Sequence, residues 1–98
     1  MGFGADGGTI CNTGQVAVTG TIATLLAANT TQSRVSITIS NTSTVASPIS
    51  LYVGPSGITT STGHYIPPAS SWTTTFRGTI YAIGSGSMTA TYFEEVNA

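Results

Sequence analysis

Alternation of apolar and polar residues is the main pattern along this chain. Residues 34–40, RVSITIS, place Val35, Ile37 and Ile39 on one face and hydroxyl side chains on the other. This period of two is typical of a half-buried β-strand. Residues 48–54, 70–76 and 88–94 repeat the pattern, and residues 15–20 are a further strand candidate. Residues 79–84, TIYAIG, form a more continuous apolar run, which predicts a central strand covered on both faces.

Turn-forming sequences such as GPSG, STGH, IPPAS and GSGS separate these segments. Many short, threonine-rich strands at this spacing predict an all-β protein, a small antiparallel β-sandwich or jelly-roll-like barrel. One segment is ambiguous: the alanines and leucines of residues 21–30, TIATLLAANT, are compatible with a strand or with a short helix.

The first residues differ in composition from the rest of the chain. Residues 1–14, MGFGADGGTICNTG, are rich in glycine, and their apolar handles are Phe3, Ile10 and Cys11. We interpret residues 1–14 as a flexible N-terminal arm and residues 15–98 as a single β-sandwich domain. The arm lacks the basic and apolar regions of a signal peptide, so we expect synthesis in a cytoplasm.

Charge is scarce: charged residues make up 5% of the chain, against a usual value of about 25%. Two arginines cannot supply the phosphate contacts of a nucleic-acid-binding protein, and the apolar runs are too short to cross a bilayer, so neither partner is expected. Weak charge repulsion suits a subunit of an assembly. The sequence leaves open whether Glu94 and Glu95 pair with Arg34 or Arg77, and whether they do so across a subunit boundary.

His64 is the obvious catalytic candidate. A triad would need a hydroxyl such as Ser61 and one of the few acids, yet no serine lies in a nucleophile-elbow sequence. One histidine and one cysteine cannot close a metal site in one chain, although a ring of His64 side chains around an oligomer axis is an alternative. We therefore predict a protein that is not an enzyme, with no catalytic residue, no metal and no cofactor, and an exposed or hydrogen-bonded His64.

The stretch from Ser56 to Phe76 is instead a candidate contact surface. Its hydroxyls and glycines permit close approach of a partner's main chain without removing charge from water. The expected interface residues of this loop are Ser56, Thr59, Thr60, His64 and Tyr65.

Aromatic residues suggest a second kind of site. Tyr52 and Trp72 could form a platform for a glycan, because aromatic rings stack on the apolar faces of sugars. The alternative is that Trp72 fills the core of the small sandwich and the tyrosines lie at its edges.

Three segments resemble a known group of proteins. RVSITISNTST, PISLYVGPSGITTSTGHYIPP and GTIYAIGSGSMTATYFEE are similar to segments of small β-rich structural proteins encoded near the capsid genes of tailed phages, over about residues 32–95. Among these, the sequence is most similar to capsid decoration (cement) proteins. The resemblance implies a virion component on the capsid exterior that forms a homotrimer at local three-fold axes and bridges subunits of the major capsid protein.

The resemblance also implies a role for the N-terminal arm, which in such proteins packs along the major capsid protein. Here Phe3, Thr9 and Ile10 are the expected contacts, and strand addition would supply main-chain hydrogen bonds. The alternative function is a carbohydrate- or receptor-binding module of a phage tail, fibre or capsid exterior.

Overall fold

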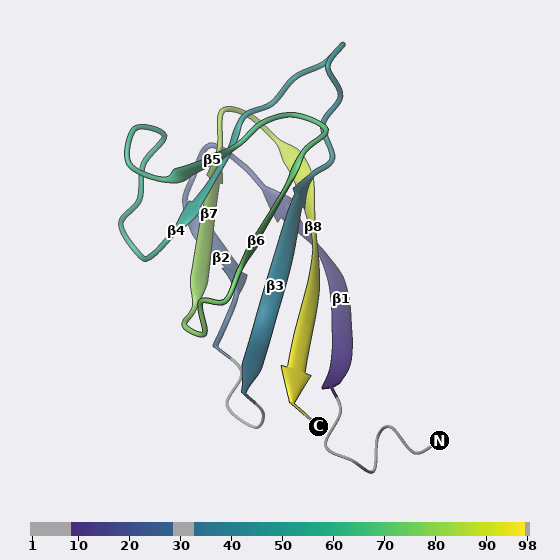
Figure 1. Ribbon diagram of the computed structural model, residues 1–98. Helices are drawn as coiled ribbons and strands as arrows, with labels where there is room; N and C mark the ends of the chain where they lie inside the picture. The colour runs from purple at the N-terminus through teal and green to yellow at the C-terminus, as the bar shows by residue number, and fades with distance from the viewer. Residues whose placement is uncertain (1–8, 29–32, 98) are drawn as a thin grey trace.

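The chain forms a sandwich of two four-stranded antiparallel sheets in the computed structural model, which describes residues 9–28 and 33–97 (Figure 1). The strand order is β1-β8-β3-β6 in the first sheet and β2-β7-β4-β5 in the second. The strands are β1 (Thr9–Val18), β2 (Ala23–Leu26), β3 (Arg34–Asn41), β4 (Leu51–Gly54), β5 (His64–Ile66), β6 (Ser71–Thr74), β7 (Ile80–Gly84) and β8 (Met88–Asn97). The predicted all-β sandwich is confirmed.

The connectivity is that of a jelly roll. The first strand pairs with the eighth, the second with the seventh, the third with the sixth and the fourth with the fifth, all antiparallel. The chain is therefore one long hairpin whose two halves roll up together into two sheets. Both sheets keep two edge strands, so the structure is an open sandwich.

The core lies between the inner faces of the two sheets. Ile37 and Ile39 of β3 face inward from the first sheet, and Leu51 and Val53 of β4 from the second, and all four are buried. This placement confirms the period-two prediction for both strands. Outward, the same strands carry hydroxyls: Thr38 is hydrogen-bonded to the hydroxyl of Thr73 on β6 at 2.8 Å between the oxygens.

The predicted boundary between arm and domain at residue 14 is wrong, because β1 begins at Thr9 and pairs with β8 along its whole length. Gly14 lies opposite Tyr92, and the phenol ring covers it so closely that an added Cβ would be 2.5 Å from the Tyr92 oxygen. Glycine here serves close packing. Residues 1–8, with Phe3, lie outside the described residues.

Other local predictions also need correction. Val35 does not face the core: the register shifts between Arg34 and Ser36, and this bulge turns the Val35 side chain to the exposed side. Residues 23–26, which could have been helical, form strand β2 because they pair with β7. In β7 itself, alternate residues are only half-buried, so its outer face is not fully covered.

Two of the few charged residues form a buried ion pair inside the sandwich. The Arg34 Nε donates a hydrogen bond to Glu94 Oε2 at 2.7 Å, and both side chains are almost fully buried. Asn12 of β1 donates to the other Glu94 oxygen at 3.2 Å. Glu95 instead accepts a hydrogen bond from Ser36 on the outer face. The pairing that the sequence left open is thus resolved within one chain for Glu94.

The same guanidinium holds two loops at one end of the sandwich. Arg34 Nη1 donates to the carbonyls of Phe76 and Gly78, and Nη2 donates to the carbonyl of Ala27. The rigid fork of donors suits arginine to this role. As a result, the β6–β7 connection that carries Phe76 has a defined position beside the candidate site.

Candidate functional site

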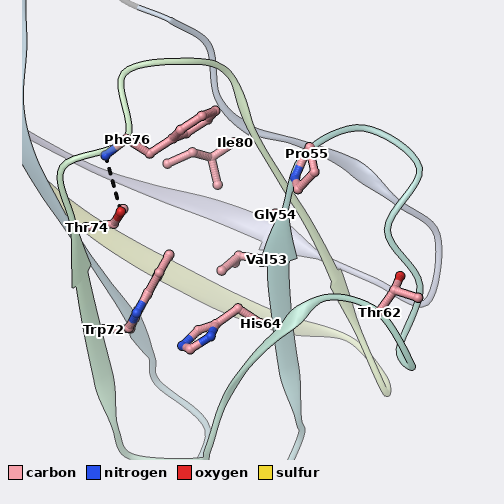
Figure 2. A pocket seen from close by; sticks show the side chains of 9 residues that line it. All are labelled: Val53, Gly54, Pro55, Thr62, His64, Trp72, Thr74, Phe76 and Ile80. Carbon is pink, nitrogen blue, oxygen red and sulfur yellow. Dashed lines mark hydrogen bonds between the residues drawn. The ribbon is translucent and has the colours of Figure 1, made fainter.

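A pocket of about 390 Å³ opens beside β6, between the two sheets (Figure 2). We call it the aromatic groove. It is lined by Val53, Gly54, Pro55, Thr62, His64, Trp72, Thr74, Phe76 and Ile80.

Strand alternation explains why these side chains meet. Val53 of β4 lies opposite His64 of β5, so both point to the inner side of the second sheet. In the first sheet Trp72 and Thr74 of β6 lie opposite Ile39 and Ile37, so they also point inward. β5 and β6 are edge strands of different sheets, and their inward side chains therefore line the rim of the sandwich.

Trp72 and His64 form the floor at one end of the groove. Their ring centroids are 4.3 Å apart and the planes are inclined by 31°. Figure 2 shows the two rings side by side, with Phe76 and Ile80 at the other end. Trp72 is half-buried and packs against the core, whereas Phe76 is 50% exposed. The groove is therefore an accessible extension of the hydrophobic core.

Few polar groups line the groove. It comes from the hydroxyls of Thr62 and Thr74, the imidazole of His64 and the indole nitrogen of Trp72. The Thr74 hydroxyl already accepts a hydrogen bond from the Phe76 backbone nitrogen at 3.2 Å. Such a surface can bind an apolar or aromatic group and orient it with few hydrogen bonds.

The predicted contact residues divide between a loop and a strand. Ser56, Thr59 and Thr60 are exposed in the connection between β4 and β5, where Thr59 and Thr62 hydrogen-bond to each other. His64 and Tyr65 do not belong to that loop, because they form β5 and pair with β4. Both are exposed on an edge strand.

Tyr52 and Trp72 do not form one platform. Tyr52 alternates with the buried Leu51 and Val53, so it lies on the outer face of the second sheet, where its ring centroid is 5.4 Å from that of Tyr65. Trp72 points into the aromatic groove from the other sheet. The aromatic neighbour of Trp72 is instead His64, and Phe76 lies at the other end of the groove. The shared face of Trp72, Thr74 and Phe76 is visible in the sequence alternation, but their meeting with β5 is not.

The arm residues are only partly described. Thr9 starts β1 opposite Asn97, and Ile10 on the same strand is 46% exposed. Across the described ranges there is no group of three or more histidine, cysteine, aspartate or glutamate residues that could hold a metal. In the same part of the chain, no helix has the length and apolar character needed to cross a membrane.

Comparison with known proteins shows likeness in fold. No family model matches the chain, and no curated protein matches it in sequence. The stem and receptor binding domain of the spike protein P1 from bacteriophage PM2 is similar with a TM-score of 0.60 and 15% identity, over 79% of this chain and 29% of that one. This chain thus spans less than a third of the spike chain.

A second similar structure covers most of both chains. It comes from the Bacillus endospore appendages, described as a novel family of disulfide-linked pili, with a TM-score of 0.53 and 16% identity over 93% of this chain and 88% of that one. At these identities the comparisons show that the sandwich is shared, and the groove of this chain is described by its own residues.

Proposed function

We propose that this chain is a structural subunit of a virion, and that it decorates the capsid as a homotrimer bridging major capsid protein subunits at local three-fold axes. The observation that carries the proposal is the compact jelly roll, which is similar in fold to a phage spike domain. The phage-like segments between residues 32 and 95 point in the same direction.

The free edge of β1 offers a way to bind the capsid. β1 has ten residues and pairs only with β8 among the described strands, so its other edge can accept a strand from a partner. Ile10 and Cys11 are exposed on this strand and can contact that partner. Three copies in a trimer would combine such contacts into a tight attachment.

The surface charge also suits this role. Arg34 and Glu94 neutralise each other in the interior, and Arg77 and Glu95 are the charged residues left near the surface of the described chain. An interface made of hydroxyls, amides and main chain avoids the cost of removing charges from water. The proposed role is therefore adhesive and non-enzymatic, on the exterior of the virion.

Binding to capsids tests the decoration role. Expanded phage capsids prepared without this protein should bind it to saturation at a fixed number of copies per three-fold axis. Deletion of residues 2–8, which leaves β1 intact, should weaken binding at least tenfold because the strand-adding segment is shortened. Val45→Asp, at a loop residue that is 81% exposed, is the matched surface control and should bind like the unmodified protein. Unchanged binding of the deletion variant would contradict the arm model, and no binding by the intact chain would contradict decoration itself.

The runner-up function is a carbohydrate- or receptor-binding module of a tail, fibre or capsid exterior. It is favoured by the accessible aromatic groove and by the similarity in fold to a chain containing a receptor binding domain. His64→Ala removes one ring of the groove at an exposed position and should abolish glycan binding on an array while the far-ultraviolet spectrum stays unchanged. Absence of any glycan signal from the intact protein would end this alternative.

A further inference from the structure

We propose that the aromatic groove of one copy binds the side chain of Phe3 from a second copy. This inference goes beyond capsid decoration, because it concerns contact between copies of this chain and requires no capsid protein.

The lining of the groove selects a neutral aromatic group. Val53, Pro55, Trp72, Phe76 and Ile80 supply apolar surface. No carboxylate or guanidinium belongs to the lining, and its few polar side chains could hydrogen-bond only a few hydroxyls of a sugar, so an apolar ring matches the groove better. A phenyl ring loses nothing by leaving water, and it can stack against the Trp72–His64 pair or pack on Phe76 at its edge.

Phe3 is the matching group in the part of the chain outside the described residues. Residues 1–8, MGFGADGG, contain one aromatic residue, and Gly2 and Gly4 flank it. Glycines on both sides let the main chain approach a groove wall closely. The segment is continuous with β1, which begins at Thr9.

The positions of the two edges favour a second copy as the donor. Within one chain, Thr9 and Trp72 lie three strand spacings apart across the first sheet, about 14 Å, and five residues apart along β8, about 17 Å, which makes about 22 Å in all (Figure 1). A second copy that lays residues 1–8 along the free edge of β6 brings its Phe3 to the groove without crossing its own sheet. Phe3 precedes Thr9 by six residues, which reach about 20 Å when extended.

The edge of β6 can also bind the main chain of that segment. The Asn41 nitrogen donates to the Ser70 carbonyl at 2.9 Å, so alternate residues from Ser70 onward direct their hydrogen-bonding groups toward β3. Ser71 and Thr73 therefore direct theirs to the open side of β6. An added strand would hydrogen-bond there and place alternate side chains over the groove. The contact joins two different surfaces, so it is heterologous and produces rings or filaments.

Trp72 provides the readout, because it is the only tryptophan in the chain. The full-length protein is diluted over a thousandfold range while tryptophan emission, acrylamide quenching and mass by light scattering are recorded. We expect assembly and protection of Trp72 from quenching to rise together with concentration. Phe3→Ala should shift the midpoint of both curves at least tenfold to higher concentration.

Variants of the groove give the reciprocal test. Phe76→Ala removes a half-exposed aromatic ring from the side of the groove. His64→Ala serves as a second groove variant in case the first fails to fold. Each should weaken self-association like Phe3→Ala. Phe93→Ala, at a similarly exposed aromatic residue on the outer face of β8, is the matched control and should have no effect.

Mixing the variants identifies the donor. A Phe3→Ala chain keeps an intact groove, and a Phe76→Ala chain keeps an intact Phe3. When the two variants are mixed, Phe3 of the second should bind the groove of the first, and the mixture should form dimers that neither variant forms alone. The proposal is overturned if the mixture does not associate, or if Phe3→Ala leaves self-association unchanged. It is equally overturned if the intact chain stays monomeric with an exposed Trp72, or if Phe3 protects Trp72 within a monomer at every dilution. Capsid binding is measured separately, so these results leave the decoration role untouched.

Discussion

Arg34 and Glu94 form a buried ion pair inside the sandwich. A buried ion pair is stable only when its remaining donors and acceptors are satisfied. Here Arg34 donates to three carbonyls besides the carboxylate, and Glu94 also accepts from Asn12. Buried side-chain nitrogen and oxygen atoms without a hydrogen-bond partner are absent from the described part of the chain. The pair therefore acts as a clamp between strands and loops.

Loss of the Glu94 charge should be strongly destabilising. Glu94→Gln leaves the Arg34 charge buried with a neutral neighbour, so we expect the free energy of unfolding to fall by about 3 kcal/mol. Urea unfolding followed by circular dichroism measures the change. Glu95→Gln is the control at the adjacent position: its carboxylate accepts one hydrogen bond from Ser36 near the surface, and the expected loss is below about 1 kcal/mol. Equal effects of the two substitutions would contradict the clamp.

At the scale of elements, residues 9–14 were expected to be part of a flexible arm, but they belong to β1 and pair with β8. The two strands match residue for residue from Thr9 opposite Asn97 to Val18 opposite Met88. Tyr92 covers Gly14 across the pair, which gives the glycine-containing strand a side chain to pack on. A glycine that suggested flexibility in the sequence is therefore a contact position in the fold.

Gly14→Ala tests this contact. The new Cβ would lie 2.5 to 2.7 Å from Tyr92 ring atoms, so the ring must move, and we expect a loss of about 1–3 kcal/mol in unfolding free energy. In the Gly14→Ala background, Tyr92→Ala should cost less than in the unmodified protein, since the clash is then absent. Gly20→Ala is the control, because its nearest neighbour would be the Gly84 carbonyl at 4.0 Å. Additive effects of the two substitutions in the cycle would show that Tyr92 does not cover Gly14.

At the scale of the whole molecule, the sandwich has four edge strands and little surface charge. β1 and β6 border the first sheet, and β2 and β5 border the second. Natural β-proteins usually protect such edges with charges, prolines or bulges. β2 carries an irregularity between Thr24 and Leu26, and Pro67 follows β5, so β1 and β6 are the less protected edges, and the proposed contacts use these two. The proposed capsid contact uses the β1 edge and residues 2–8, and the proposed contact between copies uses Phe3 and the β6 edge. The two contacts therefore share the N-terminal segment and cannot form through the same copy of it at once.

Much of the fold could be predicted from local pattern, whereas the site could be predicted only in part. The inward faces of β3, β4, β6 and β8 follow from alternation, with Val35 as the exception because a bulge is set by the partner strand. β5 was missed because three residues, HYI, carry too little pattern to stand out from a turn-rich stretch. For the site, the common face of Trp72 and Phe76 was readable, but their pairing with His64 was not.

The sequence by itself determined the class of structure, because the period of two, the turn residues and the near absence of charge are local properties of the chain. Only the tertiary structure decided where β1 begins, which acid pairs with Arg34 and which rings form the aromatic groove. Thr9 pairs with Asn97, Arg34 with Glu94, and His64 from one sheet meets Trp72 from the other. These contacts join residues of different strands or sheets, so they depend on how the rolled hairpin closes and not on any short stretch of sequence.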